Sequence, residues 1–231
     1  MTPKLKPPYL KKIDNRGQLI VWQVDGSYIR TNIDEEFTNF GQHFRYSFIP
    51  ENELWIDQEA DPNEQKFFLE HLLVEHRLMA KSKPYNEAIE LADRAERNLR
   101  RQAGDLKKIT DNGKNLPDPK KMHKRLWRTL LCGVNVWIIE GREVRSIFDI
   151  DFTEGGHDYV YEFIPDNEVW IDDDIIDEER EYVLLHELHE RNLMAKGWIY
   201  DQAHESASRL EYHCRHFPDE LHDALVKEGW A

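Results

Sequence analysis

The sequence is poor in cysteine and has no long apolar run, and each shortage excludes a class of protein. Only two cysteines, Cys132 and Cys214, occur among 231 residues, too few for a disulfide framework or a cysteine-based metal site. We expect both to be buried thiols. The longest apolar stretch, residues 130–139, is interrupted by Gly133 and Asn135 and falls well short of the roughly 18 residues that span a bilayer. The sequence therefore predicts no membrane segment.

The N-terminal sequence and the net charge indicate which cell compartment and which partners to expect. The first residues carry lysines but are followed by no apolar stretch of the kind found in secretory signals, so the expected location is cytoplasmic. A formal net charge of −14 at pH 7 disfavours nucleic acid as a partner, because binding to phosphates needs positive charge. A peptide or protein is the expected substrate, and the sequence leaves the oligomeric state open.

An internal duplication organises the chain. Residues 21–100 align with residues 136–215 at a constant offset of 115 without a gap, and 33 of the 80 positions are identical. The string FIPENELWID in the first copy returns as FIPDNEVWID in the second. We therefore predict two homologous copies, at residues 1–103 and 129–231. Residues 104–128, which are rich in lysine and arginine, are expected to form a basic, solvated linker.

Each copy begins with β-forming residues and continues with helical patterns, which predicts the α+β class. In the second copy, runs of β-branched and aromatic residues are separated by turn residues and short connections. They favour an antiparallel meander with strands at residues 134–140, 144–152, 159–164 and 168–172. Two long helices and a short one should follow, at residues 177–196, 201–216 and 219–227. Each copy is thus predicted to be a small antiparallel sheet followed by two packed helices.

The first of the two long helices in the second copy carries the pattern His-Glu-x-x-Glu, from His186 to Glu190. At about 100° per residue, His186 and Glu190 lie on one helix face, about 40° apart, and Glu187 stands to the side, where it could reach a metal-bound water. Val183 and Leu193 continue the same stripe, so the pair should be buried. Burial of an imidazole and a carboxylate is costly unless they are paired or bind a cation, which indicates a metal site.

The next helix offers a third metal ligand. Its apolar spacing places His204 and Glu211 together on the flank of the buried stripe. Two imidazoles and one carboxylate, with a fourth position open to water, match a catalytic rather than a structural zinc site. Glu211 either binds the metal or orients His204, His189 is a further possible ligand or supporting residue, and Tyr200 is a candidate for a transition-state contact.

The first copy lacks the parts that carry the chemistry. Leu72 stands at the position of the proposed general base, and Ile89 stands at that of the third ligand. His71 and Glu75 persist one helical turn apart, and we interpret them as a buried hydrogen-bonded pair. The first copy is therefore predicted to be a non-catalytic pseudo-enzyme domain that shapes or occludes a cleft.

On these residues, the second copy resembles a zincin-type metallopeptidase domain, in which a His-Glu-x-x-His helix supplies two metal ligands and a general base. The resemblance covers residues 186–211 and their flanks. It implies that zinc is held by His186, Glu190 and His204, and that Glu187 takes the proton of a water attacking a peptide or amide carbonyl. Glu190 stands where the family has its second histidine, and a carboxylate ligand makes manganese or iron alternatives to zinc.

A looser resemblance links the second copy to small zincin-like domains of phages and mobile elements. It rests on the order of residues after the helix, which is Leu193, Met194, Gly197, Tyr200, Ala203, His204, Ala207 and Glu211. Residues 169–172 resemble the zincin edge strand along which the substrate backbone lies.

Three functions follow as hypotheses. The first is a metal-dependent hydrolase of peptide or amide bonds with an active second copy. The second is a non-catalytic binding or structural protein on a zincin-like scaffold. The third is a two-metal carboxylate protein, in which the ions are held by Glu187, Glu190, His204 and Glu211.

Overall fold

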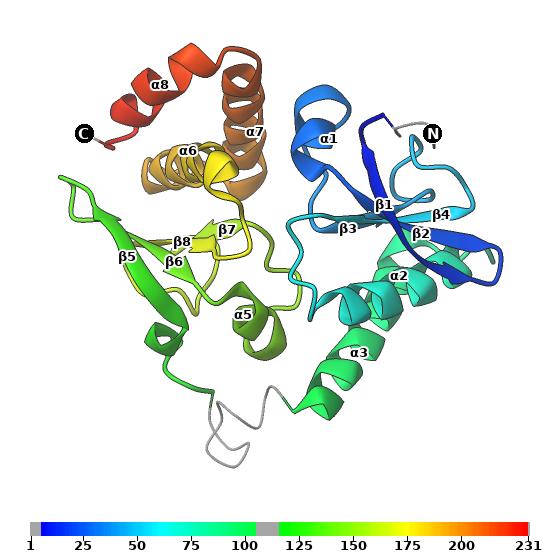
Figure 1. Ribbon diagram of the computed structural model, residues 1–231. Helices are drawn as coiled ribbons and strands as arrows, with labels where there is room; N and C mark the ends of the chain where they lie inside the picture. Colours follow the sequence, from blue (N-terminus) through cyan, green and yellow to red (C-terminus); the bar gives the residue numbers. More distant parts are fainter. Residues whose placement is uncertain (1–5, 105–115, 231) are drawn as a thin grey trace. The chain divides into compact units, whose positions relative to one another are not determined.

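The computed structural model describes residues 6–104 and 116–230. The described residues up to 104 form one compact unit, and those from 116 form another. Each unit has a four-stranded sheet and helices that follow it in the chain (Figure 1). The duplication read from the sequence therefore corresponds to two similar mixed units of helix and sheet, each of which we describe by itself.

In the first unit, the strand order is β1-β2-β4-β3. The outer pairs β1–β2 and β3–β4 are antiparallel, and the central pair β2–β4 is parallel, with Trp22 opposite Trp55. The helices α2 and α3 pack against each other after the sheet. The elements of this unit are β1 (Tyr9–Arg16), β2 (Leu19–Val24), α1 (Gly26–Asn32), β3 (Phe40–Gln42), β4 (Glu53–Asp57), α2 (Gln65–Met79) and α3 (Tyr85–Ala103).

The second unit repeats this topology with the strand order β5-β6-β8-β7. Its central pair β6–β8 is again parallel, with Trp137 opposite Trp170. The long helices α6 and α7 pack together, and α8 closes the chain against them. The elements are η1 (Pro119–Met122), β5 (His123–Thr129), β6 (Asn135–Ile139), α5 (Gly141–Ile147), β7 (Gly155–His157), β8 (Glu168–Asp172), α6 (Asp177–Ala195), α7 (Tyr200–His216), η2 (Pro218–Glu220) and α8 (Leu221–Lys227).

The predicted antiparallel meander is wrong. A parallel pair needs a crossover connection. The crossover between β6 and β8 contains α5, whose last residues, 144–147, are the beginning of the run 144–152 predicted as a strand. Val144 is fully buried there, so its apolar side chain serves a helix rather than a strand. The run 159–164 forms turns instead of a strand. Consequently β8 is an interior strand, and the edge strands of this sheet are β5 and β7, not residues 169–172.

The predicted linker is shorter than expected. Its C-terminal part forms η1 and the strand β5, while residues 105–115 lie outside the described residues. The lysines and arginines of β5 belong to an edge strand, where such charges oppose unwanted strand pairing. Of the two cysteines, Cys214 is buried as predicted, but Cys132 is exposed, in the turn between β5 and β6. None of the helices in residues 6–104 and 116–230 combines the length and the hydropathy that a membrane span requires.

The core of the second unit explains why α6 is held firmly over the sheet. Strands β6 and β8 bury Val136, Ile138, Val169 and Ile171, and α6 buries a set of leucines and a valine against them. The same cluster includes residues of α7 and α8. Burial of each such side chain contributes roughly 1.5–3 kcal/mol relative to exposure, so the position of α6 is well determined.

A buried ion pair joins the short helix to the sheet in both units. Arg30 contacts Asp57 in the first unit at 2.9 Å, and Arg145 contacts Asp172 in the second. All four side chains are almost fully buried. Because the pair occurs in both copies, the acidic cluster of residues 172–174 is part of the shared scaffold.

Candidate metal centre

A second buried chain of polar contacts runs through the helices of both units. Each series of contacts starts at a glutamate before or within the first long helix and continues through an arginine and a glutamate of the second long helix. It then reaches the His and Glu pair of the first long helix and ends at a residue of the short strand β3 or β7. In the first unit the members are Glu64, Arg100, Glu96, His71, Glu75 and Gln42, with successive closest contacts of 2.6, 2.8, 3.1, 3.3 and 2.7 Å. In the second they are Glu179, Arg215, Glu211, His186, Glu190 and His157, at 2.8, 2.8, 3.0, 3.7 and 2.9 Å.

In the first unit, the imidazole of this series of contacts is paired on both sides by carboxylates. His71 contacts Glu96 and Glu75 through its two ring nitrogens. Burial lowers the pKa of His71, but the hydrogen bonds to the two carboxylates outweigh burial and raise the pKa to about 9. His71 is therefore an imidazolium that donates on both sides. Phe40 lies on its ring at 5.0 Å between centroids, so an apolar ring occupies the space beside the pair, as expected for a structural pair.

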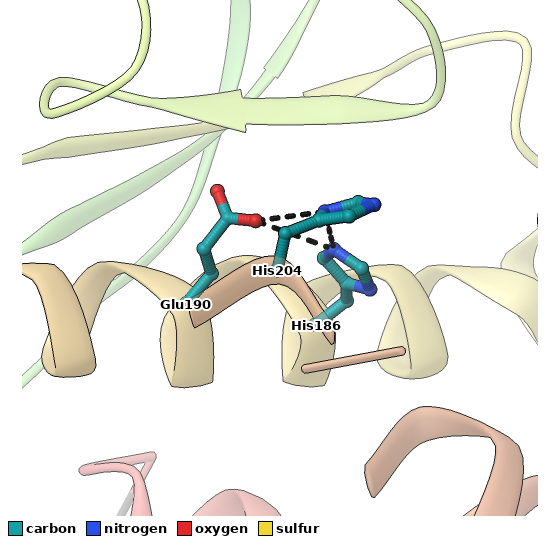
Figure 2. A group of neighbouring side chains, drawn as sticks. All are labelled: His186, Glu190 and His204. Carbon is teal, nitrogen blue, oxygen red and sulfur yellow. Dashed lines mark hydrogen bonds and ion pairs between the residues drawn. The ribbon is translucent and has the colours of Figure 1, made fainter. Parts of the chain in front are cut away.

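In the second unit, a further imidazole joins the pair and three ligand atoms converge (Figure 2). His204 Nδ1 lies 3.1 Å from His186 Nε2 and 2.9 Å from Glu190 Oε2, and the last two atoms are 3.7 Å apart. A tetrahedral ion with bonds of about 2.0–2.1 Å separates its ligand atoms by about 3.3 Å. The triangle formed by these atoms therefore has the size that a metal ion requires.

The contacts behind His186 leave its Nε2 atom as a ligand. Its other nitrogen, Nδ1, lies 3.0 Å from Glu211 Oε2 and donates to that carboxylate. Once a metal ion displaces the proton of Nε2, such a bond fixes the tautomer in which Nε2 carries the lone pair. Glu211 also accepts from Arg215 through Oε1 at 2.9 Å. The sequence predicted that Glu211 would bind the metal or orient His204; instead, it orients His186, and both of its oxygens are engaged.

His157 supports the metal ligand Glu190, a role that the sequence pattern did not predict. Its side chain is fully buried, and its Nε2 atom lies 2.9 Å from Glu190 Oε1. The backbone N–H of Tyr159 donates to its Nδ1 atom, so Nε2 carries the proton and donates to Glu190. This leaves Glu190 Oε2 to face the two histidines.

Gln42 has the same role in the first unit. Its side-chain NH₂ donates to Glu75 Oε1 at 2.7 Å, and its oxygen accepts from the backbone N–H of Phe44 at 2.8 Å. His157 is therefore a positioning residue rather than a ligand, since both of its nitrogens are used. The alignment of the two copies could have pointed to this role. Gln42 aligns with His157, each directly after a glycine that both copies share, and both side chains can donate one hydrogen bond and accept another.

Glu187 lies beside Glu190 and His157, in space that a glycine provides. A carboxylate oxygen of Glu187 is within 4.8 Å of both Glu190 and His157. A Cβ atom at Gly155 would lie 3.0 Å from Glu187 Cγ and Oε1, so a side chain at this position would force Glu187 to shift. Burial raises the pKa of Glu187 to about 8, with His186 opposing the rise and Glu190 adding to it. A nearby cation reverses this effect and favours the carboxylate, the form that acts as a base.

Two other candidates have different positions. His189 points away from the three ligand atoms, since its nitrogens contact Glu228 Oε1 at 2.7 Å and Ser206 Oγ at 2.9 Å. It therefore links α6 to α7 and α8. The ring of Tyr200 stacks on His204 at 5.4 Å between centroids, which helps to hold that imidazole in place.

The site is open to solvent on one side. The side chain of His204 is 33% exposed, against 13% for His186 and 4% for Glu190. An ion held by these residues would be reached from the side of His204, and a water molecule could complete its coordination. Three protein ligands with an open position are typical of catalytic zinc sites.

Three of the differences between the two copies lie at this site. Phe40, Leu72 and Ile89 of the first unit are replaced in the second by Gly155, Glu187 and His204. Each change removes an apolar side chain beside the conserved pair or adds a group that can bind a cation or a proton. The chain matches no family model, no curated protein and no solved structure.

Proposed function

We propose that this protein is a metal-dependent hydrolase of peptide or amide bonds, with its active site in the second unit. The observation that carries the proposal is the convergence of His186 Nε2, Glu190 Oε2 and His204 Nδ1 within 3.7 Å of one another, next to the carboxylate of Glu187. The resemblance of the second copy to zincin-type metallopeptidases also supports the proposal.

The residues divide the chemistry between them. His186, Glu190 and His204 would hold the ion, which would supply a water of lowered pKa and polarise the scissile carbonyl. Glu187 is placed to take the proton of the attacking water and to return it to the departing amine. Glu211 and His157 orient two of the ligands, so the site is held in one geometry before substrate binds.

Zinc is the metal that this donor set favours. Two imidazole nitrogens and one carboxylate oxygen, with an open position, form a common catalytic zinc set. The carboxylate makes manganese and iron the alternatives, because harder ligands suit them better than sulfur or a third imidazole. The low exposure of Glu190 means that its charge needs a partner at all times, and a divalent cation provides one.

The first unit acts in this proposal as a pseudo-enzyme domain. It keeps the buried chain of Arg100, Glu96, His71 and Glu75 but has Phe40 packed on His71. The shared chain stabilises the fold, and the metal chemistry is added to it in the second unit.

Metal analysis of four purified proteins tests the proposal. After expression with zinc, the wild type should contain one zinc ion per chain and digest fluorescein-labelled casein. His204→Ala should lose the zinc, whereas Glu187→Gln should keep it and lose the activity. Ile89→Ala, at the position of the first unit that matches His204, is the control and should keep both. Equal zinc in the wild type and in His204→Ala would contradict the assignment of the third ligand.

One observation favours a second function, that of a non-catalytic binding or structural protein. The first unit shows that this scaffold retains the buried His and Glu pair without a third imidazole or a base. One zinc ion per chain with no difference in activity between wild type and Glu187→Gln would establish this alternative. Two ions per chain would indicate the two-metal carboxylate site instead.

A further inference from the structure

Three polar side chains, one from α7, one from α6 and one at the end of α8, are joined by hydrogen bonds outside the candidate metal centre. The hydroxyl oxygen of Ser206 lies 2.9 Å from His189 Nε2, and His189 Nδ1 lies 2.7 Å from Glu228 Oε1. The side chains of His189 and Glu228 are 19% and 15% exposed, and Ser206 is partly buried. A hydroxyl, an imidazole and a carboxylate are thus connected in that order within reach of solvent.

The contacts of Glu228 determine the direction of both hydrogen bonds. Asn192 donates to Glu228 Oε2 at 2.8 Å and to the backbone carbonyl oxygen of Glu228 at 3.1 Å. Burial opposes the charge of Glu228, but the hydrogen bonds from His189 and Asn192 outweigh burial and lower the pKa of Glu228. Glu228 is therefore a carboxylate that accepts from His189 Nδ1. In the neutral imidazole, this leaves Nε2 to accept from the hydroxyl of Ser206.

The first unit has apolar residues at the positions of the hydroxyl and the imidazole. Leu91 aligns with Ser206, and Val74 aligns with His189. The two long helices of the first unit nevertheless pack against each other. The three connected side chains are therefore not a requirement of the shared helix pair.

The attachment of α8 does not explain the three side chains either. Leu221, Ala224 and Leu225 of α8 belong to the apolar core cluster of the second unit, and Leu225 is fully buried. Burial of apolar side chains stabilises such a contact more than one or two hydrogen bonds near the surface. A chemical role gives a better reason for placing a hydroxyl, an imidazole and a carboxylate here.

The arrangement is that of an activated serine. A serine hydroxyl becomes an effective nucleophile when a base within about 2.6–3.2 Å accepts its proton and a third group orients the base. Both hydrogen bonds meet this distance. Ser206 lies inside α7, where the backbone N–H groups are used within the helix. Because this backbone cannot stabilise a charged carbonyl oxygen, the site is restricted to acyl groups with a good leaving group.

We propose that Ser206 and His189 are the catalytic residues of a second hydrolytic site, which acts on activated esters such as aryl esters, and that Glu228 positions His189. This inference does not rest on the proposed function. The oxygen of Ser206 bonds to the ester carbonyl carbon while its proton passes to His189 Nε2. The bond from that carbon to the alcohol oxygen then breaks, and the alcohol leaves with the proton.

Water completes the reaction on the acylated serine. The water oxygen bonds to the acyl carbon, and one water proton passes to His189 Nε2. The bond between the acyl carbon and the oxygen of Ser206 then breaks, and this oxygen recovers the proton from His189 as the carboxylic acid leaves. Ser206 and His189 are thus restored for the next ester.

Covalent labelling of the full chain with a fluorophosphonate–rhodamine probe tests the site. The phosphorus of the probe should bond to the oxygen of Ser206 as fluoride leaves, and peptide mass spectrometry should locate the label there. Ser206→Ala should take up no label and should show no burst of 4-nitrophenol with 4-nitrophenyl acetate. Ser208→Ala is the matched control, since Ser208 donates to the backbone carbonyl oxygen of His204 at 3.1 Å, and it should be labelled like the wild type.

Two variants test the groups behind Ser206. His189→Gln should slow the labelling by at least about 100-fold, because the acceptor of the serine proton is lost. Glu228→Gln should slow it by about tenfold or more, because a neutral amide no longer holds the imidazole in the required tautomer. Deuterium uptake by peptides from α6, α7 and α8 should equal that of the wild type in both variants, which separates a chemical role from a structural one.

The label and its rate of attachment decide the matter. A wild type that takes up no label, or a label on a residue other than Ser206, would overturn the inference. Equal labelling rates in the wild type, His189→Gln and Glu228→Gln would overturn it as well. Zinc content enters none of these measurements, so their outcome is separate from that of the tests of the candidate metal centre.

Discussion

The buried imidazole of His71 makes the stability of the first unit depend on pH. Burial opposes its charge, but Glu75 and Glu96 raise its pKa from 6.5 to about 9. Because the pKa is higher in the folded state, the stabilisation is complete below about pH 6.5 and is lost as the pH rises through about 9. At about 1.4 kcal/mol per tenfold change in proton affinity, the free energy of unfolding should fall by about 3 kcal/mol between about pH 6 and pH 9.5.

Urea titrations of the full chain at the two pH values measure this loss. After equilibration, each sample receives a short deuterium pulse at one common pH, and peptides from α2 and α3 report the unfolded fraction of the first unit alone. His71→Gln should be less stable at the lower pH and should lose most of the pH dependence. His76→Gln, on the same helix, removes a hydrogen bond to the carbonyl oxygen of Glu51 at the surface; it is the control and should behave as the wild type.

The comparison between these variants decides the matter. If the wild type and His71→Gln lose the same free energy between the two pH values, the titrating group is not His71. His71 would then not be an imidazolium in the folded first unit, and it would not donate hydrogen bonds to both Glu75 and Glu96.

Two further predictions concern the second unit. His157→Gln, which introduces the residue found at the matching position of the first unit, should keep the zinc affinity within about threefold of the wild type, whereas His157→Ala should lower it by about 10–100-fold. Competition with a chromophoric zinc chelator measures both affinities. Equal affinities of the two variants would refute the role of His157 in supporting Glu190. Gly155→Ala would place a Cβ atom 3.0 Å from Glu187 and displace its carboxylate, so the rate of casein hydrolysis should fall by about tenfold or more at unchanged zinc content. Full activity of this variant would refute the position of Glu187.

The helices and the convergence of their side chains could be predicted from the sequence. A helical period fixes which residues share a face, so His186 and Glu190 had to lie together. The apolar stripe of the next helix then had to turn His204 towards them. The comparison with Leu72 and Ile89 identified which of these residues differ between the copies, without any structure.

The sheet and its contribution to the site could not be predicted in the same way. Strand β7 has only three residues, Gly155–His157, too few for a period to be visible. The parallel pairing of β6 and β8 depends on α5, whose residues are as suited to a strand as to a helix. The contact between His157 and Glu190 joins residues 33 positions apart and depends on this tertiary arrangement.

The packing of Phe40 beside His71 has a consequence for the history of the duplicated halves. Leu72→Glu alone would bury a carboxylate in the apolar cluster of Leu72, Phe68 and Phe40, at a cost of several kcal/mol. Removing the ring of Phe40 alone would leave a void worth about 3–5 kcal/mol, a large share of the roughly 5–15 kcal/mol that keeps a domain folded. Either of these two substitutions made alone would thus cost the first unit a large part of its stability, so its own core opposes a change towards ion binding.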